Sequence, residues 1–222
     1  SSTIMGLNSS TAGVASATEA VSLSTQGGSM LAVDRNFAPL TNVMTWMDQR
    51  AAAEADELCA AIGTEELYRA SGWKPGAAYD CAKILWLRRH RPEIFARTAS
   101  FVTTLEYMNM RLTGRNVSDP SNAAIRILYH IREGRYDQRI LSFLGISVSQ
   151  LPQILPAGCE IGCLTEAAAR DLGLHTGVRV YNGAHDQYCA SLGAGAVSVG
   201  DMLVATGTAW VVLGVTDRLF TS

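Results

Sequence analysis

The sequence predicts an α/β protein in which a mixed β-sheet is flanked by helices. Short apolar or β-branched runs alternate with helical stretches along the 222 residues, and some strands follow one another as hairpins. Hydrophobic residues make up 48% of the chain and charged residues 17%, which is typical of a folded core rather than a disordered segment. No linker, repeat or low-complexity tract divides the chain, so one domain is expected after an irregular lead-in over residues 1–19.

The first half of the chain is predicted to alternate short strands with helices. The expected strands are Ala20–Ser24, Met30–Val33, Val43–Met47 and Phe101–Thr103, and the expected helices are Asp48–Ile62, Asp80–His90 and Leu105–Leu112. The strands are rich in apolar or β-branched residues, and turn residues such as Asp34-Arg35-Asn36 separate two of them. Gly63, Pro92 and Gly114 follow the three helices, and both residue types favour the end of a helix.

The second half of the chain finishes with its most regular part. The expected helices are Gln138–Leu144, Thr165–Leu172 and Asp186–Leu192, and the expected strands are Val178–Tyr181, Met202–Thr206 and Ala209–Val215. Asn182-Gly183-Ala184 is predicted to be a turn before the last helix, because an Asn-Gly pair favours turns. Ala123–Ile131 stays open between helix and strand, because its apolar residues fit either period.

Composition and charge argue against several kinds of partner. The net charge is −2, which gives no electrostatic case for binding nucleic acid or an anionic membrane surface. The apolar runs are strand-length, far below the roughly 20 residues that a membrane-spanning helix needs. The five cysteines are irregularly spaced, which favours reduced thiols in a cytoplasmic protein. Cys159 and Cys163 lie four residues apart, but no second pair or histidine cluster completes a metal site.

His185-Asp186 lies at the border between the predicted turn and the last helix. In open α/β sheets, ligands bind at the carboxyl ends of strands, so a carboxylate here can accept a proton from a substrate hydroxyl or hold a polar ligand. The alternative is that Asp186 only caps the helix, and the pattern alone slightly favours that alternative. His185 by itself is better interpreted as a structural or orienting residue.

Gly207-Thr208 is predicted to be a tight turn between two strands. Glycine lets the backbone approach a phosphate closely, and a threonine hydroxyl can bond a phosphate oxygen. A glycine hairpin needs no ligand, however, so this signal is weak alone. The phosphate-loop pattern with its lysine and the dinucleotide-binding glycine fingerprint are both absent from the sequence.

The segment from Trp46 to Arg50 combines an aromatic ring, the carboxylate of Asp48 and a guanidinium. Such a mixture suits a polyhydroxylated ligand, and the equal alternative is a helix cap beside a core tryptophan and a surface arginine. The basic run Arg88-Arg89-His90-Arg91 is most simply a solvated face that complements the helix dipole.

Taken in chain order, these segments resemble the FGGY family of carbohydrate kinases, which includes xylulokinase, fuculokinase and glycerol kinase. The matching motifs are Ser24-Thr25-Gln26, Trp46–Arg50, Lys83–Glu93, Arg111-Leu112-Thr113-Gly114, Ser118–Ala123, Gly183-Ala184-His185-Asp186-Gln187, Leu192–Gly195 and Thr206-Gly207-Thr208-Ala209. Each motif is short, but so many in the family's order over residues 24–209 are not expected by chance.

The resemblance implies an actin-like ATPase domain (ribonuclease H-like) that uses ATP and Mg²⁺ to phosphorylate a sugar or polyol hydroxyl. It places Asp186 on the family's catalytic base and Gly207-Thr208 on a turn that contacts nucleotide phosphate. The residues implied for the sugar side are Gln26, Trp46, Asp48, Arg50, His185 and Gln187. The expected partners are therefore the sugar or polyol and ATP, and a homodimer is left open.

The sequence departs from the family's pattern in two ways. Gly27-Gly28 stands where many pentulose kinases have a Met-His pair, so xylulose does not follow as the substrate. The family's Asp-x-Gly-Thr segment is not found, and its second domain would begin beyond Phe220. Residues 20–222 are therefore expected to form an incomplete N-terminal, sugar-binding domain. The alternatives are a non-catalytic sugar-binding or assembly module, an inactive kinase fragment and, less favoured, an actin-like ATPase without a sugar substrate.

Overall fold

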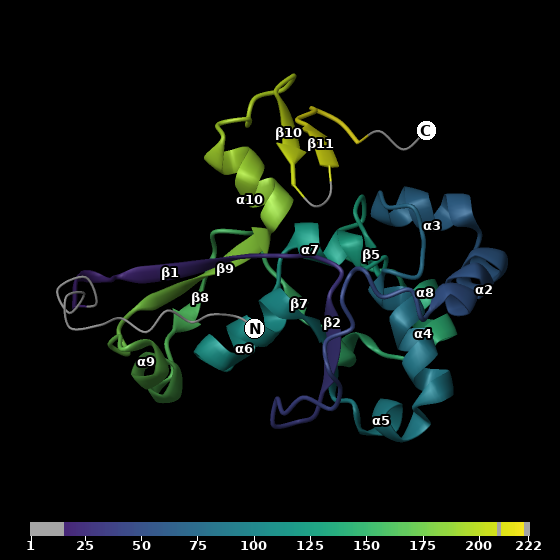
Figure 1. The fold of residues 1–222 in the computed structure, drawn as a ribbon, viewed down its shortest axis with the longest axis horizontal. Coiled ribbons are helices and arrows are strands. Elements are labelled where there is room, and N and C mark those ends of the chain that lie inside the picture. The colour runs from purple at the N-terminus through teal and green to yellow at the C-terminus, as the bar shows by residue number, and fades with distance from the viewer. Residues whose placement is uncertain (1–15, 208–209, 220–222) are drawn as a thin grey trace.

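A three-stranded mixed sheet organises one side of the protein in the computed structural model, which describes residues 16–207 and 210–219. Its strands are β1 (Ala20–Thr25), β9 (Arg179–His185) and β8 (Glu160–Cys163), in the order β1-β9-β8. β1 runs parallel to β9 and β8 runs antiparallel to it, so the predicted mixed sheet is confirmed. Helix α6 (Thr104–Thr113) packs against all three strands, and α9 (Glu166–Leu172) packs against α6 (Figure 1).

Most of the remaining helices gather on the other side of the molecule, beyond β2 (Figure 1). The helices there are α2 (Ala52–Ile62), α3 (Thr64–Ser71), α4 (Asp80–His90), α5 (Pro92–Arg97) and α8 (Gln138–Leu144). Three of the remaining strand pairs form short two-stranded ladders: β2 (Met30–Val33) with β3 (Ser100–Thr103), β4 (Val117–Ser118) with β7 (Gln153–Ile154), and β5 (Tyr129–His130) with β6 (Arg135–Tyr136). A 3-10 turn, η2 (Val148–Gln150), packs near β3.

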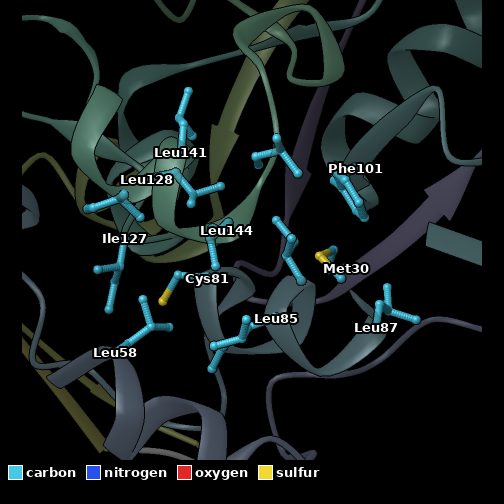
Figure 2. Packing of buried hydrophobic residues seen from close by; sticks show 14 of the residues in the cluster. Met30, Leu58, Cys81, Leu85, Leu87, Phe101, Ile127, Leu128, Leu141 and Leu144 are labelled. Carbon is cyan, nitrogen blue, oxygen red and sulfur yellow. The ribbon is translucent and has the colours of Figure 1, made fainter. Parts of the chain in front are cut away.

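The largest hydrophobic core surrounds helix α4. Leu85 and Leu87 of α4 are buried in one cluster with Leu58 of α2, Phe101 of β3 and Leu141 of α8 (Figure 2). Each such side chain contributes about 1.5–3 kcal/mol when it is fully removed from water. A second, smaller cluster lies between α6, α9 and the three-stranded sheet. The predicted bounds of α4, Asp80–His90, are confirmed, and its position at the centre of the core explains why this helix is so well defined.

A buried ion pair fixes the start of α4. The Arg126 Nε donates to Asp80 Oδ2 over 2.6 Å, and both side chains are fully buried. Arg126 Nη2 also donates to the carbonyl oxygen of Phe101 over 2.7 Å. Through these contacts Arg126 links α4, β3 and the end of α7 (Pro120–Ile125). Removal of either partner would leave a buried charge without its counter-ion.

The expectation of a strand over Val43–Met47 and a helix from Asp48 is wrong. Within this stretch Met44 forms only an isolated bridge with Met30, and α2 begins at Ala52. The buried Lys83 Nζ donates to the carbonyl oxygens of Met44 and Thr45, over 3.2 and 2.9 Å. The same two carbonyl oxygens also accept the backbone N–H groups of Met30 and Asp48, so they are satisfied without a regular strand.

The expectation of a turn at Asn182-Gly183-Ala184 is also wrong, because β9 continues through all three residues. Gly183 is required by a close approach: an added Cβ would lie 1.8 Å from the carbonyl oxygen of Leu23 in β1. The side chain of Asn182 is buried, and its Nδ2 donates to the carbonyl oxygens of Ser118 and Leu155. A pair of residues that is typical of turns therefore lies inside a strand for reasons of packing.

The segment 123–131, which the sequence leaves open, is both helix and strand. Its first residues belong to α7, and Tyr129–His130 form β5. Pro92 does not only follow α4, because it is also the first residue of α5, where its missing N–H costs nothing. The short helices α3 and α5 were not anticipated.

The C-terminal hairpin stands apart from the two cores, next to α10 (Asp186–Gly193), at the top of Figure 1. Its strands are β10 (Met202–Thr206) and β11 (Trp210–Gly214), which pair antiparallel as the sequence predicts. Several of its apolar side chains are exposed, including Met202, Val204, Trp210 and Val212. Over the described part of the chain, no helix has both the length and the apolar character needed to cross a membrane.

Candidate active site

A cavity of about 780 Å³ lies where the end of β9, the residues after β1 and the C-terminal hairpin meet. Six of the residues selected from the sequence line it: Gln26, Trp46, His185, Asp186, Gln187 and Gly207. They come from segments up to 181 positions apart (207 − 26) and are brought together by the parallel pairing of β1 with β9 and by the hairpin. The carboxyl ends of β1 and β9 therefore face the same cavity, as expected for a ligand site in an α/β sheet.

Asp186 is the first residue of α10 and follows directly after β9. Its side chain is 45% exposed, and Asp186 Oδ1 lies 3.4 Å from His185 Nδ1. The helix cap is formed by His185, because His185 Nδ1 accepts the backbone N–H of Gln187 over 3.3 Å. The capping alternative for Asp186 is thereby removed, and its carboxylate faces the cavity without that structural duty.

The position of His185 is fixed from behind by the start of α7. The backbone N–H of His185 donates to Ser121 Oγ over 3.1 Å, and Ser121 Oγ donates to Asp119 Oδ2 over 2.5 Å. Asp119 also accepts the backbone N–H groups of Ser121 and Asn122 as the cap of α7. Burial lowers the pKa of His185, while the charges of Asp186 and Asp119 act in the opposite direction. The imidazole is therefore neutral near pH 7.

The two glycines after Gln26 form the floor of the cavity beside this histidine. An added Cβ on Gly27 would lie 2.3 Å from His185 Cδ2, and Gly28 has a φ of +68°. The carbonyl oxygen of Gly28 accepts a 2.7 Å hydrogen bond from Lys83 Nζ. Lys83 is fully buried, and desolvation lowers the pKa of its amine.

Trp46 lines the cavity next to Gly28 and is 37% exposed. Its backbone N–H donates to Ser29 Oγ over 3.2 Å, and its Cβ lies 3.4 Å from where a Cβ on Gly28 would stand. Lys83 bonds the carbonyl group of the preceding residue, Thr45, so one ammonium group holds both the glycine segment and the tryptophan segment.

Asp48 and Arg50 are not among the residues that line this cavity. They pair with each other instead, with Arg50 Nη2 at 2.8 Å from Asp48 Oδ2. Hydrogen bonds from the guanidinium lower the pKa of the Asp48 carboxyl. Arg50 lies over the ring of Trp86, 5.1 Å from its centroid, and lines a separate cavity of about 480 Å³ that also includes Arg91. The Trp46–Arg50 motif is thus divided, with its aromatic end at the first cavity and its charged end outside.

The basic run at the end of α4, Arg88 to Arg91, is largely engaged in contacts with neighbouring residues. Arg89 Nη1 pairs with Glu57 and Arg91 Nε with Glu93, while Arg88 Nη1 donates to the carbonyl oxygen of Phe143. This agrees with the interpretation of a solvated, structural face.

The C-terminal hairpin supplies the last wall of the cavity. Gly207 lies there, together with the apolar residues Ala205, Val211, Val212 and Leu213. Thr208, the other half of the predicted phosphate turn, lies outside the described residues. The predicted nucleotide side is therefore represented in this geometry by Gly207 alone.

Three aromatic residues of the cavity were missed by sequence reasoning: Trp73, Tyr79 and Tyr188. Trp73 and Tyr79 form a tilted pair with ring centroids 6.1 Å apart, and burial raises the pKa of Tyr79. The ring of Tyr188 lies edge-on to His185 at 5.8 Å. Nothing in the local sequence pattern indicates that Trp73 or Tyr79 lines a cavity. Tyr188 could have been selected, because a residue three positions after His185 on a helix lies on the same face.

The described lining offers one carboxylate, one imidazole, two amides and several aromatic faces. Aromatic rings and amides together suit a ligand that carries hydroxyl groups on an apolar carbon skeleton. Within the described residues, no three His, Cys, Asp or Glu side chains gather into a metal site. Mg²⁺ that accompanies a nucleotide needs only one or two carboxylates beside waters and phosphate oxygens, and Asp186 is the one carboxylate among the described lining residues.

The cavity lies at the junction of strand β9 with helix α10, where the carboxylate of Asp186 faces aromatic rings and amides. This is the arrangement of a ligand-binding α/β domain. Residues 6–193 match the N-terminal domain of the FGGY family of carbohydrate kinases, so the chain belongs to that family.

Known members of the family align with most of this chain. The xylulose kinase of Staphylococcus xylosus is 26% identical over 195 residues, which are 88% of this chain and 40% of the relative. The L-fuculokinase of Escherichia coli K12 is 29% identical over 193 residues, which are 87% of this chain and 40% of the relative. The crystal structure of xylulose kinase from Rhodospirillum rubrum superposes with a TM-score of 0.84 at 27% identity, covering 91% of this chain and 41% of that one. This chain thus spans about 40% of the length of these relatives.

These similarities confirm both the family and the actin-like ATPase fold expected from the sequence motifs.

Proposed function

We propose that this domain acts in the ATP-dependent phosphorylation of a sugar or polyol hydroxyl. The observation that carries the proposal is the position of Asp186: a half-exposed carboxylate at the carboxyl end of β9, free of capping duty and facing the cavity. The membership of the chain in a family of carbohydrate kinases supports the same class of reaction.

In the proposed reaction Asp186 is the catalytic base. Its carboxylate accepts the proton of the substrate hydroxyl while that oxygen forms a bond to the γ-phosphorus of ATP. The bond between the γ-phosphorus and the β–γ bridging oxygen breaks, and ADP leaves. A carboxylate suits this task because positioning and charge stabilisation contribute most to phosphoryl transfer, and the base only receives a proton.

The proposed sugar side consists of Gln26, Trp46 and Gln187 around Asp186. Gln187 Oε1 is buried and has no hydrogen-bond partner among the described residues, so a substrate hydroxyl could donate to it. The ring of Trp46 offers a flat apolar face of the kind on which sugar rings pack. The predicted contribution of Asp48 and Arg50 to sugar binding is not supported by this geometry, since they lie outside the lining.

The proposed nucleotide side is the hairpin. Gly207 allows close backbone approach to a phosphate, and it lies in the same cavity as Asp186. We assign the γ-phosphate of the substrate ATP to the space between this turn and the carboxylate, and Thr208 is proposed to add a hydroxyl donor.

The names of the relatives suggest which substrates to test first. A coupled ATP-turnover screen of the protein produced from the complete gene should use xylulose and fuculose, together with a panel of further ketoses, polyols and deoxy sugars. We expect sugar-dependent release of ADP with one of these compounds. Sugar binding by calorimetry without any turnover would instead favour the non-catalytic sugar-binding module.

A further inference from the structure

We propose that Ser121 is a positioning residue for the phosphoryl transfer: its hydroxyl group holds the end of β9 so that the carboxylate of Asp186 faces the cavity. Ser121 is not among the residues that line the cavity. It acts through a hydrogen bond with the backbone N–H of His185, the residue before Asp186. This inference rests on the proposed function, because it concerns how the proposed catalytic base is held in place.

The two neighbouring strands of β9 do not support it over the same length. β1 pairs with β9 as far as His185, whereas β8 pairs with it only as far as Tyr181. Beyond Tyr181, the segment that joins β4 to α7 supplies further contacts. Asn182 Nδ2 donates to the carbonyl oxygen of Ser118 over 3.0 Å, and the N–H of His185 donates to Ser121 Oγ over 3.1 Å. The hydroxyl group of Ser121 therefore bonds β9 at the residue where the strand ends.

A buried carboxylate fixes the orientation of this hydroxyl group. Ser121 Oγ donates to Asp119 Oδ2 over 2.5 Å, and a carboxylate can only accept, so the hydroxyl proton points to Asp119. The serine oxygen is thereby left to accept the N–H of His185. Asp119 is only 2% exposed and is itself held by the side-chain amide of Asn122, whose Nδ2 donates to Asp119 Oδ1 over 2.7 Å. Ser121 Oγ is consequently an acceptor with a fixed direction.

The hydrogen bond to His185 acts on Asp186 through the backbone. His185 caps α10 and Asp186 is its first residue, so the peptide group that Ser121 holds lies where the chain turns from the strand into the helix. The side chain of Asp186 is 45% exposed, and its direction depends on the backbone that carries it. A misplacement of about 1 Å at a reacting group can lower the rate about 100-fold. Loss of the serine hydroxyl should therefore affect catalysis more than sugar binding.

The test is Ser121→Ala in the protein from the complete gene, because this change deletes the hydroxyl group and leaves Asp119 to cap α7. We expect kcat to fall about 10- to 100-fold, while the dissociation constant of the sugar, measured by calorimetry, stays within about threefold of the parent value. Ser121→Thr keeps a hydroxyl group and should recover most of the lost rate.

Thr165→Ala is the matched control. The hydroxyl group of Thr165 also accepts a backbone N–H, that of Ala168 over 3.2 Å, and Thr165 lies outside the lining of the cavity. Thermal unfolding should show a similar small destabilisation in Thr165→Ala and Ser121→Ala, but only Ser121→Ala should lose kcat.

A double-mutant cycle separates positioning of Asp186 from a general structural role. If Ser121 acts through the carboxylate of Asp186, Ser121→Ala should change kcat by less than about twofold when Asp186 is already replaced by asparagine. A general loss of structure would instead lower kcat by the same factor in both backgrounds.

The outcomes separate this inference from the proposed function. Parent-like kcat in Ser121→Ala, or equal losses in both backgrounds of the cycle, overturns the positioning role and leaves the kinase proposal intact. Failure of the unaltered protein to turn over any sugar would contradict the kinase proposal.

A spectroscopic measurement then decides the positioning role without turnover. In protein labelled with carbon-13 at the aspartate carboxyl groups, the NMR signal of Asp186 is the one that disappears in Asp186→Asn. This signal should shift in Ser121→Ala and stay in place in Thr165→Ala. A signal that is unchanged in Ser121→Ala would show that the hydroxyl group does not position the carboxylate.

Discussion

The ammonium group of Lys83 donates a 2.7 Å hydrogen bond to the carbonyl oxygen of Gly28, on the floor of the candidate active site. The same group bonds the carbonyl oxygens of Met44 and Thr45, just before Trp46. A fully buried lysine on the central helix α4 therefore holds two lining segments of the cavity at fixed positions. It connects the hydrophobic core to the site through three hydrogen bonds.

Replacement of Lys83 by methionine should destabilise the protein strongly. Methionine fills a similar volume but removes all three hydrogen bonds from the ammonium group. The carbonyl oxygens of Met44 and Thr45 keep the backbone N–H groups of Met30 and Asp48, whereas that of Gly28 loses its ammonium donor, so we expect a loss of about 2–3 kcal/mol in the free energy of unfolding. Lys74→Met, at an exposed position, is the matched control and should stay within about 0.5 kcal/mol of the parent. Urea unfolding measures both. A Lys83→Met protein as stable as the control would show that the three hydrogen bonds contribute nothing.

Gly183→Ala should disrupt the pairing of β1 with β9. The new Cβ would collide with the carbonyl oxygen of Leu23, which is backbone and cannot rotate away, so we expect destabilisation of about 3 kcal/mol or more. Gly193→Ala is the control, because nothing lies within 4 Å of its added Cβ and alanine favours the helix that it ends. Thermal unfolding that leaves the two variants equally stable would mean that the close approach of the strands is not maintained in solution.

Gly183 also shows where sequence reasoning reaches its limit. Asn182-Gly183 has the local chemistry of a turn, but the contact with Leu23, 160 positions earlier in the chain (183 − 23), decides its conformation. The bounds of α4 and, within one residue, those of α9 could be predicted, because helical periodicity and end signals are local properties. The pairing of β1 with β9 could not, since parallel strands so far apart carry no mark of their partner.

The residues of the candidate site also fall into those that local motifs predict and those that only tertiary packing brings together. Gln26, His185 and Asp186 were selected from short motifs and do line the cavity. Trp73 and Tyr188 were missed, because only tertiary packing brings these aromatic rings to the cavity. Asp48 and Arg50 were also selected, but they lie outside the lining of this cavity and pair with each other.

Stability should depend on pH through His185. Burial lowers its pKa in the folded protein below the value of about 6.5 that it has when unfolded. The unfolded chain therefore binds the proton more readily than the folded protein. The contribution of neutral His185 to the free energy of unfolding is fully present above about pH 6.5 and is lost as the pH falls below that value. When the pH is lowered from about 7.5 to 5.5, the urea concentration at the midpoint of unfolding should decrease. The decrease should be smaller in His185→Asn.

The control for this pH effect is His175→Asn, which should keep the pH dependence of the parent because its side chain is exposed. Identical pH profiles for the parent and His185→Asn would mean that His185 is not titrated differently in the folded state.

Thr208→Val should weaken the use of ATP more than the binding of sugar. Valine keeps the shape of threonine and removes the hydroxyl that is proposed to contact phosphate next to Gly207. The loss of one such hydrogen bond raises the KM for ATP by about fivefold, with the dissociation constant of the sugar unchanged. Steady-state kinetics at varied ATP and calorimetry with the sugar give the two quantities. If neither changes, the turn is only a hairpin.

The most direct test of the proposed kinase reaction is kcat of Asp186→Asn, measured in the protein from the complete gene with its best sugar substrate. Asparagine keeps the size and polarity of the side chain but cannot accept the proton, so kcat should fall by about 100-fold or more with little change in the calorimetric affinity for the sugar. Asp171→Asn, on the exposed face of α9, should retain the parent rate. Near-normal turnover by Asp186→Asn would remove this carboxylate from the role of catalytic base and contradict the mechanism proposed for this site.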